Sequence, residues 1–213
     1  MTEHEHALQT DVPQESGHGG HEHEEPENGD ETLSADELRA AEIEARRRRA
    51  QAQIRQYPDV ALRLRAHEIV DFDDELLQLV ERMQLLMRDA QGVGLAATQV
   101  GVLRRLFVFE LDEEGTQAVA NPRIVDPSSE TVIDEEGCLS LGGVRVPVER
   151  STSLTLEGQD PTGACVRHEL AGMAARIVQH ELDHLDGLLI IDRTDAEHRK
   201  EALGILRPRP ILR

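Results

Sequence analysis

Apolar residues recur along two stretches of the chain at the spacing of an amphipathic helix. Residues 71–90 carry the first stripe, and Asp73 or Asp74 can cap its start. Residues 169–187 carry the second stripe, which ends at Gly187. We predict two long helices, each with one buried face. The apolar positions of the first are 76, 79, 80, 83, 86, 87 and 90, and those of the second are Met173, Ile177, Leu182 and Leu185.

Between these helices the apolar pattern changes to the short runs that are typical of strands. RRLFVFEL (104–111) predicts a buried strand, and AVANPRIVD (118–126) predicts another that Pro127 stops. Short strands are expected within 130–141 and 144–160. Helices combined with many short strands indicate an α+β fold, in which antiparallel sheets pack around a central helix.

Three further segments complete the pattern. Residues 33–54 predict a helix, because Ser34 and Glu37 can form a capping box at its start. GVGLAATQVG (92–101) has glycines at 92, 94 and 101, which predict either a loop or a close approach of the backbone. Residues 195–207 predict a last helix, which a proline ends.

The first 33 residues differ in composition from the rest. Residues 1–32 contain ten acids and neither Lys nor Arg, and they hold five of the ten histidines. Such a segment cannot bury enough apolar surface to offset its ordering entropy, so we expect a disordered leader. A weak metal-scavenging role is an alternative to a plain solvated tail, which we favour. We divide the chain into this leader (1–33), a lead-in helix or linker (34–52), a folded domain (53–206) and a basic tail (207–213).

The net charge of −19 limits the partners to expect. General nucleic-acid binding requires a positive face, and the acidic balance disfavours it. RRRR (46–49) can touch RNA or form a solvated helix face, and we favour the second. The sequence has no apolar run of the ~18 residues that span a membrane, and MTEHEHALQT lacks the features of a signal peptide. We expect a cytoplasmic protein with no DNA or membrane partner.

VQHELDHLDG (178–187) contains the pattern His-Glu-x-x-His. His180 and His184 are one helical turn apart, so their side chains leave the same face ~5–6 Å apart at Cβ, which suits two imidazoles on one metal ion. Glu181 lies between them, close enough to handle a proton of a bound water. A metal hydrolase of this kind needs a third protein ligand.

Three kinds of residue are candidates for that third ligand. His198 lies downstream, but it does not complete a known three-histidine pattern. Of the two cysteines, we interpret Cys165 as a small buried side chain and Cys138, in EEGCLSLGG, as the ligand. The downstream acids lie closer to the histidines than is usual for a glutamate ligand: Asp186, Asp192, Asp195, Glu197 and Glu201.

Over residues 53–194 the chain resembles the peptide deformylase family. Three motifs match in order and spacing: GVGLAATQ (92–99), EGCLS (136–140) and QHELDHLDG (179–187). Together they are far more specific than His-Glu-x-x-His alone. Two shorter matches are the opening YPD…LR at 57–63 and NP at 121–122.

The resemblance implies a metal-dependent hydrolase that removes the formyl group from the N-terminal formyl-methionine of new polypeptides. It implies that a metal-bound water attacks the formyl carbon, with Glu181 as general acid and base. Oxyanion donors are the side chain of Gln99 and the N–H of Leu139. The metal ligands are Cys138, His180 and His184. One Cys and two His suit zinc by ligand softness, whereas the resemblance implies Fe²⁺, which we favour.

Further expectations concern the substrate. The glycines of GVGLAA allow an extended peptide to approach the backbone, with main-chain pairing for affinity and one apolar pocket for Met. Arg150 and Asp183 are predicted to pair and orient the helix. Nascent chains emerge at the ribosome, so the resemblance implies transient ribosome contact. The candidate substrate-binding residues are Val93, Gly94, Leu95, Leu139, Met173 and Ile177.

Two departures from the family pattern are visible. Gly142-Gly143 stand where many relatives have Pro or Pro-Gly after CLS, beside the expected cleft, and Val60-Ala61 replace a common Pro-Val. Two rival functions are considered: a zinc protease with a different third ligand, and a non-catalytic binding or metal-sensing module. The second is disfavoured because Glu181 and all three ligands are intact.

Overall fold

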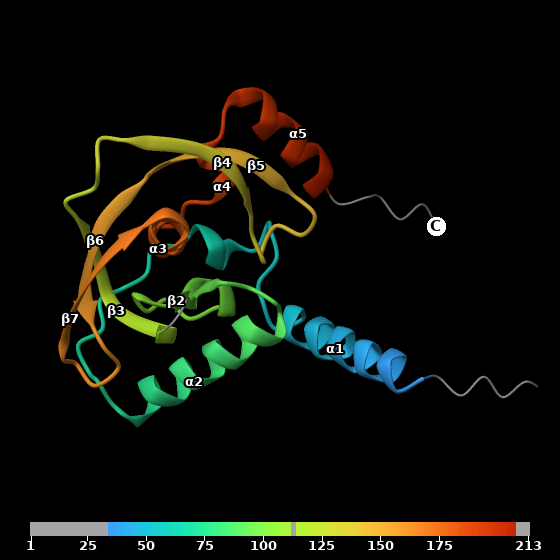
Figure 1. The fold of residues 1–213 in the computed structure, drawn as a ribbon, viewed down its shortest axis with the longest axis horizontal. Helices are drawn as coiled ribbons and strands as arrows, with labels where there is room; N and C mark the ends of the chain where they lie inside the picture. The colour runs from blue at the N-terminus through green and yellow to red at the C-terminus, as the bar shows by residue number, and fades with distance from the viewer. Residues whose placement is uncertain (1–33, 112–113, 208–213) are drawn as a thin grey trace, which may run out of the picture.

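The computed structural model describes residues 34–111 and 114–207. It contains a five-stranded antiparallel sheet in the order β1-β2-β3-β6-β7 (Figure 1). A separate antiparallel hairpin is formed by β4 and β5. The strands are β1 (Gly94–Ala96), β2 (Leu106–Leu111), β3 (Gly115–Val125), β4 (Thr131–Gly137), β5 (Arg145–Ser151), β6 (Ser153–Gln159) and β7 (Cys165–Ala171).

Five α-helices and two short 3₁₀ helices accompany these strands in the described residues. None of the helices in these ranges is long and apolar enough to cross a membrane. The helices are α1 (Ala35–Gln51), α2 (Asp74–Asp89), α3 (Gly172–Leu185), α4 (Ile190–Arg193) and α5 (Ala196–Leu206), and the 3₁₀ turns are Val60–Arg63 and Ala97–Val100.

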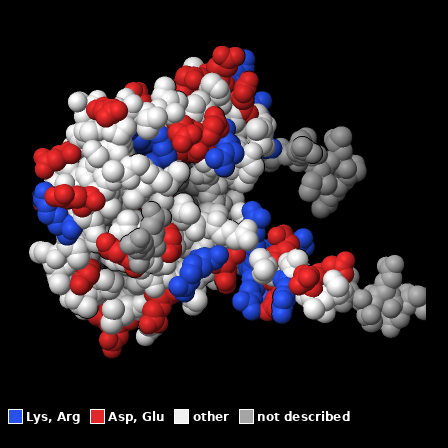
Figure 2. Space-filling view, viewed as in Figure 1, with Lys and Arg blue, Asp and Glu red and all other residues white. Residues whose placement is uncertain are grey.

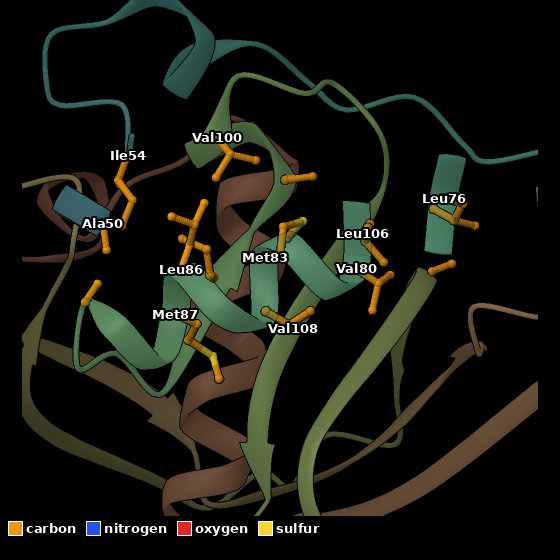
Figure 3. Packing of buried hydrophobic residues seen from close by; sticks show 14 of the residues in the cluster. Ala50, Ile54, Leu76, Val80, Met83, Leu86, Met87, Val100, Leu106 and Val108 are labelled. Carbon is orange, nitrogen blue, oxygen red and sulfur yellow. The ribbon is translucent and has the colours of Figure 1, made fainter. Parts of the chain in front are cut away.

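Strand β2, second in the sheet, is buried on both faces, because its alternate side chains enter two different cores. Leu106 and Val108 pack in the core beneath α2, with Met83 as a fully buried member (Figure 3). Phe107 and Phe109 point to the opposite face and pack in the core beneath α3. The prediction of a buried strand over 104–111 is therefore confirmed.

Helix α3 lies between the five-stranded sheet and the β4–β5 hairpin (Figure 1). Ala175, Val178 and Leu185 face the sheet and are completely buried. A third core lies under the hairpin and includes residues of α4 and α5. The predicted arrangement, antiparallel sheets around a central helix, is confirmed.

The helix starts were partly predictable. Ser34 and Glu37 form the expected capping box at α1, and Asp73 caps α2 by accepting a hydrogen bond from the N–H of Leu76 at 2.9 Å. The prediction of one helix over 169–187 is wrong at its start. Residues 169–171 end strand β7, and Gly172 adopts φ +57° where the chain turns into α3.

Of the two alternatives predicted for 92–101, the loop is wrong and the close approach at its glycines is confirmed. Gly94 to Ala96 form β1, which pairs with β2, and a 3₁₀ turn follows directly. All residues from Gly94 to Val100 are buried, so this glycine-containing segment belongs to the core. The predictions for residues 1–33 and 208–213 lie outside the described residues.

Candidate metal centre

Three potential ligand side chains meet where the hairpin approaches α3. His180 and His184 are one turn apart on α3, with their ring centroids 5.0 Å from each other. Cys138 directly follows β4, and its Sγ lies 3.2 Å from Nε2 of His184. One ligand atom from each residue lies within 4.8 Å of the other two.

The other proposed third ligands lie elsewhere. His198 is on α5 and pairs with Asp195 at 2.6 Å. Cys165 is exposed at the start of β7. Two of the downstream acids are engaged with arginines: Asp186 with Arg105 and Asp192 with Arg63.

Glu136 is a central residue of the site that the sequence reasoning missed. Its carboxylate accepts hydrogen bonds from Arg150 (3.0 Å from each of two nitrogens) and from Arg176 (2.8 Å). Oε2 of Glu136, which also accepts one of the two Arg150 bonds, lies 3.0 Å from Nδ1 of His180. Burial raises the pKa of Glu136, but hydrogen bonds from His180 and Arg150 outweigh it and hold that pKa at about 2. An anionic carboxylate only accepts, so His180 donates through Nδ1 and keeps Nε2 for a ligand.

The predicted contact between Arg150 and Asp183 is present. Nη1 of Arg150 donates to Oδ2 of Asp183 at 2.6 Å, and Arg193 donates to the same carboxylate. Asp183 and Arg150 are both buried. This pair connects β5 to α3 one turn away from the His180 contact.

The two histidines differ in their charge. Burial lowers the pKa of His180, but hydrogen bonds to Cys138 and Glu136 outweigh it and hold that pKa above its usual value. Burial, together with the positive charge of His180, holds the pKa of His184 well below its usual value. Without a metal the site therefore favours a proton on His180, which a metal at Nε2 would displace, and it keeps His184 in the neutral form that binds metals.

Glu181 lies against the backbone of β1. It is only 3 % exposed, and its Oε2 has no hydrogen-bond partner in the described residues. A Cβ on Gly94 would lie 2.3 Å from Oε1 of Glu181, so any larger residue at that position would displace the Glu181 carboxylate. Burial raises the pKa of Glu181 to about 7, which suits a group that both accepts and gives a proton.

Gln99 is held by hydrogen bonds at both ends of its amide. Its Oε1 accepts from the N–H of Ala96 at 2.8 Å, and its Nε2 donates to Oγ of Ser140 at 3.1 Å. The same Nε2 lies 3.7 Å from Sγ of Cys138, so the amide N–H₂ is directed toward the candidate ligands. The N–H of Ser140 also donates to that sulfur, at 3.4 Å.

The candidate pocket residues divide into three groups. Val93 and Met173 are exposed, whereas Ile177 packs in the core beneath α3. Leu139 is partly buried, and a Cβ on Gly92 would meet its Cδ1 at 2.7 Å, which brings the first two motifs into contact. The Leu95 side chain is fully buried in the α2 core, so Leu95 can contact a ligand only through its main chain.

The glycines that depart from the family pattern form a tight turn. The N–H of Val144 donates to the carbonyl of Leu141 at 3.1 Å, and Gly143 has φ +79° at the third position of this turn. A turn with positive φ at that position favours glycine, and proline cannot adopt it.

The residues present fit a divalent transition-metal ion. A thiolate with two imidazoles is a donor set for such ions. Oε2 of Glu181, the residue next to His180, is buried without a partner in the described residues, which fits a further group bound at this site.

Comparisons with known proteins agree with this geometry. Residues 51–200 match the family model described as polypeptide deformylase. The chain is 44 % identical to peptide deformylase 1 of Corynebacterium glutamicum, over 73 % of this chain and 94 % of that protein. A crystal structure of peptide deformylase from Thermotoga maritima has 46 % identity and a TM-score of 0.64, covering 67 % of this chain and 96 % of that one. Peptide deformylase from Legionella pneumophila has 36 % identity and a TM-score of 0.69, covering 72 % and 91 %.

Replacing Glu136 should strongly destabilise the metal-free fold. The variant Glu136→Ala leaves two buried guanidinium groups without their shared carboxylate, and removing one partner of a buried ion pair costs about 3–5 kcal/mol. Chemical unfolding of the metal-free protein measures this loss. Glu135→Ala is the matched control, because its exposed side chain is the neighbour in β4 and surface changes stay within about 0.5 kcal/mol. Equal stabilities of the two variants would contradict the role given to Glu136.

Proposed function

The chain belongs to the polypeptide deformylase family, and from this premise we propose that Cys138, His180 and His184 bind one divalent metal ion while Glu181 transfers the protons of the reaction. The chain is a hydrolase that removes the formyl group from the N-terminus of newly synthesised polypeptides and releases formate, which is the family's reaction. The convergence of the three ligand atoms within 4.8 Å is the observation that carries the proposal. The family match and the converging ligand atoms disfavour both the zinc-protease and the non-catalytic alternatives.

The proposed mechanism assigns a separate task to each side chain. When bound, the ion supplies Lewis-acid chemistry that makes water acidic near neutral pH. Glu181 accepts the proton of the attacking water, and later gives a proton to the leaving amine. The fixed amide of Gln99 and the N–H of Leu139 donate to the formyl oxygen as negative charge develops on it.

The peptide is proposed to lie along β1 and beside the turn after β4. Among the described strands, β1 is an edge strand of the sheet, which suits main-chain pairing with an extended chain. The exposed side chains of Val93 and Met173, with Leu139, are the apolar groups proposed to contact the methionine side chain. Ile177 is proposed to form the floor of that contact, and Leu95 takes part only through its main chain.

Two further proposals, one on positioning and one on the identity of the metal, complete the site. Arg150 and Asp183 are proposed to orient α3 relative to the hairpin, since their contact at 2.6 Å is buried. We propose Fe²⁺ as the working metal, by the family resemblance, although the donor set of one thiolate and two imidazoles also suits zinc.

New polypeptides emerge at the ribosome, so we propose a cytoplasmic location and transient ribosome contact. Acidic and basic side chains are intermingled on the face shown in Figure 2. One hollow of about 900 Å³ in the described surface has more basic than acidic side chains, because its lining contains four arginines and two glutamates. Arg65 and Arg105 pair with Asp186, and Arg123 and Arg167 share Glu157, so a small excess of guanidinium groups remains for RNA phosphates. The charged lining residues are Arg65, Arg105, Arg123, Arg167, Glu68 and Glu157.

Glu181→Ala should keep its metal and lose turnover. All three ligands remain, whereas the group that moves both protons is removed, and general acid–base catalysis contributes about 10²–10⁴-fold. Metal content per chain and formate release from a formyl-Met tripeptide are the two measurements. A metal-loaded variant that still turns over at the wild-type rate would exclude Glu181 as the acid and base.

Metal identity is tested by comparing iron and zinc forms of the wild-type chain. From the family resemblance we expect faster formate release from the Fe²⁺ form, which is loaded anaerobically because a ferrous thiolate site is open to oxidation in air. Cys138→Ala should lose tight binding of either ion, whereas Cys165→Ala is the matched control and should bind normally. A zinc form as active as the iron form would overturn the metal assignment. Unchanged binding by Cys138→Ala would overturn the third ligand.

Ribosome contact is tested by sedimentation at low salt. Arg123→Glu with Arg167→Glu should sediment less with ribosomes than wild type, while tripeptide deformylation stays unchanged. Arg82→Glu with Arg88→Glu makes the same change of charge on the exposed face of α2 and serves as the control. Equal losses in both double variants would remove the hollow as the contact surface. An absence of wild-type sedimentation would remove ribosome contact itself.

A further inference from the structure

One side of α3 carries a polar stripe that faces the β4–β5 hairpin. Arg176, Gln179, His180 and Asp183 follow one another at helical spacing, and each makes a hydrogen bond to a residue of that hairpin. Three of these side chains bind one hairpin residue each. Arg176 is different, because it contacts both strands.

Arg176 donates to three acceptors in the hairpin. Its Nη2 binds the carbonyl of Val132 in β4 at 2.8 Å, and its Nη1 binds the carbonyl of Val148 in β5 at 3.0 Å. Nη1 also binds Glu136 at 2.8 Å. Arg176 is only 6 % exposed, so these bonds are made away from water. Its planar guanidinium group is held in one orientation by its acceptors in the hairpin.

The hairpin needs such a fixing point because it is not part of the main sheet. Its two strands pair only with each other among the described strands. Cys138 follows directly on β4, whereas His180 and His184 are carried by α3. The position of the thiol relative to the imidazoles is therefore set by how the hairpin lies on the helix.

We propose that Arg176 is a positioning residue of the metal centre. By holding the main chain of β4 and β5 against α3, it keeps Cys138 beside His184 and presents the Glu136 carboxylate to His180. Arg176 touches neither the reacting atoms nor a ligand atom. This inference rests on the proposed function, since it assumes that these three residues bind the ion.

The proposal is tested by cobalt binding to the metal-free full chain. Titration with Co²⁺ against a competing chelator gives the affinity, and the thiolate-to-cobalt absorption per bound ion reports the Cys138 bond. Arg176→Met keeps the length of the side chain and removes its donors. Arg176→Lys keeps a charge and some of the donors. Arg167→Met is the matched control, because Arg167 is an exposed arginine that pairs with Glu157 in the sheet.

We expect Arg176→Met to bind Co²⁺ about 10–100-fold more weakly, as is typical when a group that supports a metal ligand is removed. Its thiolate absorption per bound ion should fall, and Arg176→Lys should recover part of both values. Arg167→Met should match the wild type. A merely structural role of Arg176 would lower thermal stability but leave the absorption per bound ion unchanged.

Several outcomes would overturn the proposal. Wild-type affinity and absorption in a folded Arg176→Met variant would do so, and so would a Lys variant no better than Met. If Arg176→Met lacks a cooperative unfolding transition, the Lys variant alone decides, and wild-type values in it would overturn the proposal. Failure of the wild-type chain to bind Co²⁺ would instead overturn the proposed function, and this inference with it.

Discussion

The carboxylate of Glu136 lies at the junction of the β4–β5 hairpin and α3 and accepts hydrogen bonds from both elements. A carboxylate removed from water is costly unless cations and hydrogen-bond donors compensate it. Arg150 compensates it from within the hairpin, and Arg176 and His180 do so from the helix. Charge compensation of one group therefore holds together the two elements that carry the candidate ligands.

This constraint explains why α3 makes apolar contacts on the side that faces the sheet and polar contacts on the side that faces the hairpin. Ala175, Val178 and Leu185 pack against the sheet, where apolar contact is sufficient. On the hairpin side, Arg176 and Asp183 are buried and polar, so each must find partners. Hydrogen bonds have preferred directions and apolar contacts do not. The hairpin is thus fixed in register on the helix, which a metal centre shared between them requires.

The sequence predicted those parts of the site that depend on local spacing. His180 and His184 share a helix face because they are four residues apart, and this holds in any fold that makes α3. Cys138 is 42 residues before His180 in the chain. Its assignment rested on its context in EEGCLSLGG and on a spacing that disfavours the downstream acids, and the family resemblance implied the same residue. The end of β7, residues 169–171, was assigned to the helix because Leu170 continues the apolar pattern across Gly172, where positive φ interrupts the chain direction.

Glu136 and Arg176 were not predicted for a different reason. In the sequence, Glu136 in EEGC and Arg176 in AARI resemble ordinary surface charges. They become buried partners only when the hairpin packs on the helix. The pattern contained one usable signal: Arg176 interrupts the otherwise apolar stretch 174–178 of a helix expected to be buried. A charge in such a place needs a compensating charge nearby.

The two buried glutamates of the site have opposite roles because their hydrogen-bond partners differ. Glu136 and Glu181 are both buried, yet the pKa of the first is held at about 2 and that of the second is raised to about 7. The difference follows from their partners, since Glu136 is surrounded by donors while one oxygen of Glu181 has none in the described residues. A bound cation would lower both pKa values, but it would not add donors to Glu181. Glu136 is thereby suited to hold a histidine, and Glu181 remains the carboxylate able to exchange a proton.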